Sequence, residues 1–293
     1  MRLFFAFALI AVGTIALAAD VPKIRVLIVD GQNNHNWKAT TPILKKHLED
    51  SGLFEVTVAT SPPQGKKEEM AKFKPDLEKI DVVLGNYNGE SWSKEFNDDF
   101  EAKLKGGKIA FAVIHAANNP FGGWKDYNEM IGMGWRDAAF GKRLKTDDSG
   151  KVEIVDAGKD KGSGHTYTGP FPITIRDTEH PITKGMPKEW LHANDELYDN
   201  MRGPVENVKL LATAKPPEGK KGSGTNEPMI WTVDYGKGRV FHTPMGHDAT
   251  SMRCIGFAST LCRGTEWAAT GKVTLALPEK FPTADKTSSI PEK

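Results

Sequence analysis

Long apolar runs alternate with helical patterns along most of the chain. Four short runs of aliphatic, β-branched and aromatic residues predict strands at Ile24–Asp30, Phe54–Ala59, Asp81–Gly85 and Ile109–Ile114. Between them, Thr40–Glu49 and Phe96–Leu104 carry apolar residues at helical spacing. Strands that are buried on both faces have continuous apolar sequences, so this alternation predicts an α/β fold. We expect a Rossmann-like, doubly wound and mainly parallel sheet.

Polar loops follow three of these strands, and a fourth follows a later strand. The loops are Gly31–Trp37, Asn86–Trp92, His115–Asn119, and Pro244–Asp248 after the predicted strand Arg239–Thr243. The carboxyl ends of parallel strands meet at one edge of a sheet, and ligands bind in the crevices beyond that edge. The four loops are therefore expected to converge on a polar ligand pocket.

The first 18 residues have the features of a secretory signal peptide. Arg2 supplies a basic start, Leu3–Leu17 is almost wholly apolar, and Ala16-Leu17-Ala18 fits the pattern at which such signals are cleaved. An uncleaved membrane anchor is the alternative interpretation. We expect a secreted or periplasmic protein with no stable membrane insertion after cleavage. One domain would span residues 22–276, and a proline-rich tail, extended or frayed, would span residues 277–293.

Composition limits the partners and the cross-links that the chain could have. The formal net charge is +1, which gives no electrostatic basis for binding nucleic acid. The two cysteines, Cys254 and Cys262, would lie about 12 Å apart on a helix, too far for a disulfide, so free buried thiols are expected. The composition of Gly141–Gly164, rich in glycine and lysine, is typical of a mobile surface excursion, with an active-site lid as the alternative.

Long aromatic-rich motifs run through nearly the whole mature chain. They are NNHNWKATTPIL within Val26–Leu44, VVLGNYNGESW (Val82–Trp92), VIHAANNPFGGWKDYNEMIGMGWR (Val113–Arg136), HPITKGMPKEWLHANDELYDNMRGP (His180–Pro204), EPMIWTVDYGKGRVFHTPMGHD (Glu227–Asp248) and RGTEWAATG (Arg263–Gly271). Together they resemble the ThuA-like, or trehalose-utilisation, family. The resemblance implies a class I glutamine-amidotransferase-like fold of the flavodoxin type. It also implies action on disaccharides or their oxidised 3-keto derivatives.

The resemblance also shows which group is missing. Amidotransferases of this fold place a cysteine nucleophile at the sharp turn after the strand equivalent to Ile109–Ile114. Here that turn carries His115, followed by Ala116 and Ala117. Covalent acyl transfer then has no attacking group, so the chain is not expected to be a glutamine amidotransferase. His242 stands where the fold usually keeps its acid–base histidine, and it would act alone as a general base or a ligand.

Histidines and glutamates near the converging loops are the candidate catalytic groups. His115 and His242 each end a strand at the same edge, so we expect them to face one pocket. Glu196 and Glu227 have apolar neighbours that would raise the pKa of a carboxyl group toward neutrality, as general acid–base catalysis requires. The structural alternative is an ion pair with Arg136, Arg202 or Arg239. Other histidines are expected on the surface or in structural roles: His47, His165 and His180.

Groups that bind sugars also gather in these segments. Amides and imidazoles hydrogen-bond hydroxyls, and indole rings stack on pyranose faces. The candidates for substrate binding are Asn34, His35, Trp37, Asn88, Trp92, Asn118, Trp135, Arg136 and Asp195. The same histidines and carboxylates could instead hold a divalent metal ion, with His247 as the candidate ligand. No HExxH motif or His-x-His spacing supports a metal site.

Two functions stay open at this point. The first is a carbohydrate-active enzyme. A 3-keto sugar has an acidic carbon–hydrogen bond beside its carbonyl group, so a general base and an electrophile or metal could drive isomerisation or elimination. The second is a non-catalytic carbohydrate-binding protein, which the missing nucleophile favours. Neither hypothesis identifies the sugar.

Overall fold

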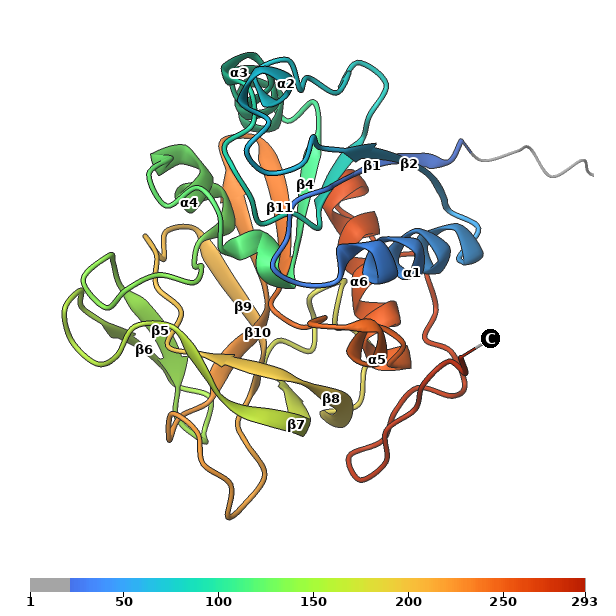
Figure 1. Ribbon diagram of the computed structural model, residues 1–293. Coiled ribbons are helices and arrows are strands. Elements are labelled where there is room, and N and C mark those ends of the chain that lie inside the picture. The colour runs from blue at the N-terminus through green and yellow to red at the C-terminus, as the bar shows by residue number, and fades with distance from the viewer. Residues whose placement is uncertain (1–21, 293) are drawn as a thin grey trace, which may run out of the picture.

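A nine-stranded sheet forms the centre of the molecule (Figure 1). The computed structural model describes residues 22–292, so the predicted signal peptide lies outside the described residues. Five neighbouring strands are parallel: β2 (Phe54–Thr60), β1 (Ile24–Asp30), β3 (Val82–Gly85), β4 (Ala110–Ile114) and β11 (Gly238–Thr243). With β11 as the fifth strand, this is the flavodoxin-type order 2-1-3-4-5. The predicted α/β, glutamine-amidotransferase-like fold is confirmed.

Antiparallel strands extend this sheet beyond β11. In spatial order they are β10 (Glu227–Tyr235), β9 (Val208–Ala214), β7 (Gly164–Ile175) and β8 (Glu189–Asp199). Figure 1 shows β7 and β8 below the parallel strands, beside the point where β4 and β11 end. A separate two-stranded sheet, β5 (Arg143–Thr146) and β6 (Val152–Val155), lies within the Gly141–Gly164 segment, and β6 is largely exposed. The predicted surface excursion is therefore only partly correct: β6 and the residues after it are exposed, but β5 is largely buried.

Helices cover both faces of the parallel strands. On one face lie α1 (Trp37–Asp50) and α6 (Ile255–Thr270), and on the other lie α3 (Lys94–Lys105) and α4 (Lys125–Ile131). The short helices are α2 (Lys67–Met70), η1 (His115–Asn118, a 3₁₀ helix) and α5 (Ala249–Met252). Helix α1 begins one turn before the predicted Thr40 because the Asn36 side chain accepts a hydrogen bond from the Ala39 amide at 3.3 Å. No helix within residues 22–292 is long and apolar enough to cross a membrane.

The C-terminal tail is extended but is not frayed. The Leu191 amide donates to the Thr283 carbonyl at 2.8 Å, and the Ile255 amide donates to the Ser288 carbonyl at 2.8 Å. Phe281 packs against Trp190, with ring centroids 5.6 Å apart. These contacts hold the tail against β8 and the start of α6. The proline-rich sequence has no periodicity, so it did not predict them. Both cysteines are buried and free, as predicted.

Close packing of α6 on β11 generates a prediction about stability. A Cβ atom added at Gly264 would lie 2.5 Å from ring atoms of Phe241, which is fully buried. Gly264→Ala is expected to lower the free energy of unfolding by about 1–3 kcal/mol, although alanine is the better helix former. Gly123→Ala is the control, because nothing lies within 4 Å of its added Cβ, and it should change stability by less than about 0.5 kcal/mol. Urea unfolding measures both variants, and a Gly264→Ala protein as stable as wild type would contradict the packing.

Candidate functional site

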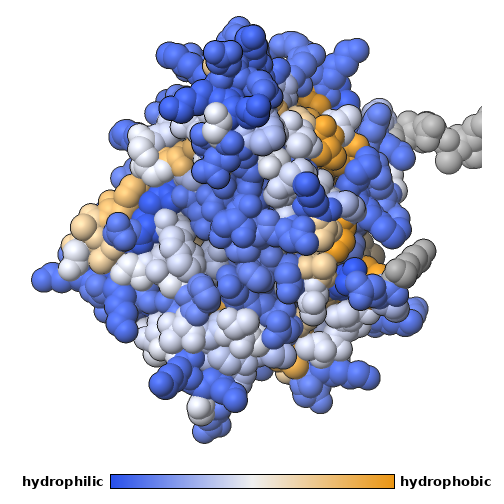
Figure 2. Space-filling model, viewed as in Figure 1, coloured by the Kyte–Doolittle hydropathy of each residue, from blue (hydrophilic) through white to orange (hydrophobic). Residues whose placement is uncertain are grey.

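Four histidines and one glutamate meet at the carboxyl edge of the parallel strands. His35 lies in the loop after β1, His115 opens η1 directly after β4, and His247 lies in the loop after β11. Glu196 on β8 and His165 on β7 complete the group, which we call the histidine–glutamate cluster. Hydrophilic residues cover the middle of the face shown in Figure 2, in front of the ends of β4 and β11. The predicted convergence of the loops after β1, β4 and β11 is therefore observed.

Short distances join the polar atoms of the cluster. The two Nε2 atoms of His35 and His115 are 3.4 Å apart. Glu196 Oε1 is 3.5 Å from His247 Nε2 and 3.6 Å from His165 Nδ1, and Glu196 Oε2 is 3.9 Å from His115 Nε2. The Glu196 side chain is 15% exposed and that of His247 is 34% exposed, so a ligand from solvent can reach both.

Backbone and side-chain acceptors determine which ring nitrogens carry protons. His115 Nδ1 is 2.7 Å from the Pro244 carbonyl oxygen, which can only accept a hydrogen bond, so Nδ1 carries the proton. His35 Nδ1 is 3.0 Å from Asn33 Oδ1, which also accepts from the His35 amide. In the neutral rings, both Nε2 atoms therefore carry lone pairs, and these lone pairs point toward the same space.

Burial keeps these two imidazoles neutral. Desolvation lowers the pKa of His115 to about 4, against the opposing charge of Asp195. Desolvation, together with the neighbouring His115 and His247, lowers the pKa of His35 to about 3. Near pH 7 both rings are uncharged, so their Nε2 atoms are available as proton acceptors or as ligands.

A bulge in β8 creates the support beneath the cluster. Phe171 pairs with His192 and Gly169 pairs with Asp195, so β8 has one residue more than β7 between these pairs. In a regular strand His192 and Asp195 would point to opposite faces, but the extra residue turns them together. His192 Nε2 lies 2.8 Å from Asp195 Oδ2. Asp195 was a predicted substrate ligand, and the structure instead buries it beneath the cluster.

Asp195 connects β8 to the loop after β11. Its Oδ2 atom accepts from the Gly246 amide at 2.7 Å, and its Oδ1 atom accepts from the amides of His247 at 3.1 Å and Glu196 at 2.8 Å. These donors and His192 offset the cost of burying the carboxylate and hold the pKa of Asp195 below its usual range against desolvation.

Two aromatic residues border the cluster. Tyr198 lies two residues after Glu196 on β8, so both side chains point to the same face. Its hydroxyl is 3.1 Å from His115 Nε2, and burial raises the pKa of Tyr198, so the hydroxyl stays protonated and donates. Trp135, a predicted binding residue, packs against Tyr198 and His165 at centroid distances of 4.7 and 5.7 Å. The sequence analysis missed Tyr198 and assigned His165 a structural role; the strand alternation Glu196-Leu197-Tyr198 was the available signal for Tyr198.

His242 lies in the core and not in the cluster. It is fully buried against Trp231, with ring centroids 3.9 Å apart. Its Nδ1 donates to the Ile131 carbonyl at 3.0 Å, and its Nε2 is 3.2 Å from Asn118 Nδ2. Both ring nitrogens of His242 therefore have partners inside the core. Asn118, which was predicted to bind substrate, is one of these partners. The structure gives these two residues a packing role.

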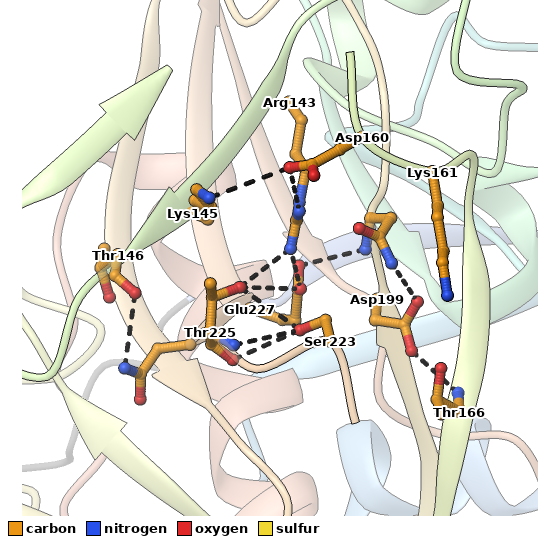
Figure 3. A network of polar contacts seen from close by, with 12 residues as sticks. Arg143, Lys145, Thr146, Asp160, Lys161, Thr166, Asp199, Ser223, Thr225 and Glu227 are labelled. Carbon is orange, nitrogen blue, oxygen red and sulfur yellow. Dashed lines mark hydrogen bonds and ion pairs between the residues drawn. The ribbon is translucent and has the colours of Figure 1, made fainter. Parts of the chain in front are cut away.

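Glu227 also lies apart from the cluster, in the network of Figure 3. It pairs with Arg143, which also contacts Asp160 at 2.8 Å, and it accepts from the Asn200 amide at 3.2 Å. Desolvation raises the pKa of Glu227 above its usual value, and the charge of Arg143 only partly offsets this effect. The structural alternative of an ion pair is observed, but the partner is Arg143. The three arginines expected as partners, Arg136, Arg202 and Arg239, donate to backbone carbonyls instead.

Other predicted binding residues serve the core or a loop. Trp92 is buried among aromatic side chains, including Phe96 at a centroid distance of 5.1 Å. Arg136 holds the chain after η1 by donating to the carbonyls of Asn119 and Pro120 at 2.6 and 2.7 Å. His47, expected on the surface, is buried, and its Nε2 lies 2.9 Å from the Met252 carbonyl.

Three predicted binding residues do lie together. Asn34, Trp37 and Asn88 line a surface hollow of 680 Å³, in which Asn88 Nδ2 donates to Asn34 Oδ1 at 2.6 Å. The hollow is polar, with Gln32, Asn33, Ser61 and Gln64 also in its wall. The loop that forms it, between β1 and α1, is the loop that delivers His35 to the cluster.

Comparisons with known proteins agree on one family. The model of the ThuA family, described as trehalose utilisation, matches residues 25–268. A crystal structure of a ThuA-like protein from Parabacteroides merdae ATCC 43184 superposes with a TM-score of 0.86 at 40% identity, over 92% of this chain and 98% of that chain. A ThuA-like protein from Bacteroides uniformis ATCC 8492 is similar in fold, with a TM-score of 0.58 at 17% identity, over 89% of this chain and 98% of that chain. No curated protein matches the sequence.

The packing role of His242 predicts how stability depends on pH. Desolvation lowers its pKa in the folded protein from 6.5 to about 3, so the unfolded chain takes up this proton first. The contribution of neutral His242 is therefore complete above pH 6.5 and is lost as the pH falls toward 3. His242→Gln should destabilise the protein at pH 8, and its stability difference from wild type should shrink by about 1–2 kcal/mol at pH 5. Urea unfolding at the two pH values tests this, and a difference that stays constant would contradict it.

Proposed function

The chain belongs to the ThuA (trehalose-utilisation) family, and we propose that it acts on a small carbohydrate at the histidine–glutamate cluster. The observation that carries the proposal is the fixed tautomer of His115. Its Nδ1 proton is committed to the Pro244 carbonyl, so its Nε2 lone pair faces a polar site at the edge where α/β sheets bind ligands. Such a nitrogen can accept a proton from a bound substrate.

A 3-keto-glycoside suits these groups. His115 Nε2 takes the proton from the carbon beside the carbonyl group, and the electron pair of that bond moves to the carbonyl oxygen. The protonated hydroxyl of Tyr198, next to His115, can turn to donate to a substrate oxygen. In isomerisation, the protonated His115 returns the proton to the former carbonyl carbon, and the neighbouring hydroxyl loses its proton to become the new carbonyl group. In elimination, the original carbonyl group re-forms, a double bond forms to the anomeric carbon, the glycosidic bond breaks, and the leaving oxygen takes the proton from His115.

The hollow lined by Asn34, Trp37 and Asn88 supports a substrate larger than one sugar ring. Trp37 offers an indole face, and Asn34 and Asn88 offer amides that hydrogen-bond hydroxyl groups. Asn33 lines the hollow and its Oδ1 contacts the His35 ring at 3.0 Å, so a disaccharide that extends past Asn33 would reach the cluster.

The backbone at His115 argues against the alternative of a binding protein that has lost its chemistry. His115 has a φ of +46°, in the left-handed region that costs a non-glycine residue energy. Such strain persists where the surrounding structure enforces it, as it does at catalytic turns. The chain keeps the strained turn and places an imidazole where the amidotransferases place a thiol.

We also propose that the protein is exported, because its first 18 residues carry the features of a signal peptide. Mass spectrometry of the protein secreted by a producing cell is expected to give a chain that begins just after Ala18. A mature chain that still begins at Met1 would contradict cleavage.

The proposed chemistry predicts the effect of His115→Asn. Asparagine tolerates the positive φ but offers no basic nitrogen, so turnover of 3-keto-trehalose or a related 3-keto-glycoside should fall by about 10²–10⁴-fold. The control is His180→Asn, since His180 packs against Trp267 outside the cluster. Product analysis on trehalose, its 3-keto derivative and a panel of other glycosides measures both variants.

Two results would overturn this proposal. Saturable sugar binding by the wild-type protein without any product would indicate a binding protein. Equal turnover by wild type and a folded His115→Asn variant would place the reaction elsewhere.

A further inference from the structure

We propose that the cluster binds one divalent transition-metal ion through His35, His247 and Glu196, and that Asp195 positions these ligands. The inference deepens the proposed function, because the ion would hold and polarise a substrate oxygen. Its test measures metal binding alone, so it can fail or succeed independently of sugar turnover.

The Nε2 lone pair of His35 has no hydrogen-bond donor within residues 22–292. The Nε2 atoms of His35 and His115 face each other at 3.4 Å, and neither carries a proton in the tautomers that Asn33 and Pro244 enforce. The Tyr198 hydroxyl donates to His115 Nε2, so His35 Nε2 is left facing another acceptor. A cation would satisfy this lone pair, since neutral imidazole is a common metal ligand.

Glu196 lacks a permanently charged counter-ion among the described residues. Within residues 22–292, the basic groups within 4.0 Å of its carboxylate are three histidines, and no lysine or arginine pairs with it. A carboxylate that is only 15% exposed normally has a counter-ion. A metal ion would supply that charge.

The donor atoms of the three proposed ligands are spaced closely enough to share one ion. One donor atom from each of His35, Glu196 and His247 lies within 4.8 Å of the other two, and the His247 Nε2 to Glu196 Oε1 distance is 3.5 Å. Two donors that each bind a tetrahedral ion at about 2.0–2.1 Å lie about 3.3–3.4 Å apart. The three side chains therefore need only small rotations to close on one ion.

The donor set indicates the class of ion and its use. Two imidazoles and one carboxylate suit zinc, iron, nickel or copper better than magnesium or calcium, which prefer oxygen ligands. Three protein ligands leave a coordination position open, as in catalytic sites. His115 Nε2, 3.9 Å from Glu196 Oε2, would then lie beside the substrate oxygen held at the open position.

Asp195 lies one layer below these ligands. Its two oxygens already accept from His192 Nε2 and from three backbone amides, those of Glu196, Gly246 and His247. The carboxylate therefore fixes the backbone of two of the three ligands, although Glu196 lies on β8 and His247 lies in the loop after β11. Such outer contacts commonly change metal affinity by about 10–100-fold when they are lost.

Cobalt binding tests the site directly. The full chain, prepared without a polyhistidine tag and stripped with a chelator, is titrated with Co²⁺ and followed by its visible d–d absorption. The expected result is one equivalent of Co²⁺ bound and displaced by Zn²⁺. His35→Gln and His247→Gln should abolish saturable binding, while His180→Asn should bind as wild type does. Absence of saturable binding by wild type, or unchanged binding by the two cluster variants, would overturn the proposal.

Asp195→Asn tests the positioning role. It should raise the dissociation constant for Co²⁺ by about 10–100-fold and alter the absorption band. Glu227→Gln is the matched control, because Glu227 is an equally buried carboxylate that lies outside the cluster. It should lower stability and leave the dissociation constant and the band unchanged. If both variants weakened Co²⁺ binding equally, the effect of Asp195 would be only structural, and its assigned role in positioning the ligands would be wrong.

A second variant covers the case in which Asp195→Asn does not fold. His192→Gln removes the imidazole that orients the carboxylate but leaves the carboxylate itself in place. It should weaken Co²⁺ binding and alter the absorption band in the same direction as Asp195→Asn. A folded His192→Gln variant with wild-type affinity and spectrum would overturn the role of Asp195.

The two proposals have separate outcomes. Turnover of a 3-keto-glycoside by metal-free protein, with no Co²⁺ bound, would leave the proposed function intact and overturn the metal site. One equivalent of Co²⁺ bound at the cluster without turnover of any glycoside would support the metal site and overturn the proposed function.

Discussion

The buried carboxylate of Asp195 is the contact on which the candidate site depends. It ties β8, from the antiparallel half of the sheet, to the loop after β11, from the parallel half. A buried carboxylate without partners would cost several kcal/mol, and its four donors offset that cost only in one arrangement of the two segments. The β8 bulge makes this arrangement possible, because it turns His192 and Asp195 to the same side. Glu196 and His247 then meet although 51 residues separate Asp195 from Gly246 in the chain.

Burial alone does not distinguish the functional histidines from the structural ones. His115 and His242 are both buried, and desolvation lowers the pKa of each far below 6.5. The difference lies in the second ring nitrogen. In His242 it meets the Asn118 amide inside the core, whereas in His115 it accepts from Tyr198 and faces His35 and Glu196 at the carboxyl edge of the sheet. A site histidine is therefore recognised here by the polar groups around its second ring nitrogen.

The sequence predicted the part of this account that depends on local pattern. The parallel strands are buried on both faces and have continuous apolar sequences, so β1 to β4 and the convergence of their loops were predictable. The antiparallel strands β7 to β9 mix polar and apolar residues, and their bulge shifts the alternation, so they gave no clear pattern. His165 and Tyr198 were misjudged or missed because they enter through those strands. The ion pair of Glu227 with Arg143 joins residues 84 apart, and no local signal identifies such a partner.

Anomalous diffraction from crystals grown with Co²⁺, recorded on both sides of the cobalt absorption edge, tests whether the cluster holds a metal ion among its lone pairs. One anomalous peak is expected about 2.0–2.2 Å from His35 Nε2, His247 Nε2 and a Glu196 oxygen, with Asp195 still bound to the Gly246 and His247 amides. An empty cluster, or cobalt bound only at other surface residues, would contradict the proposed metal site.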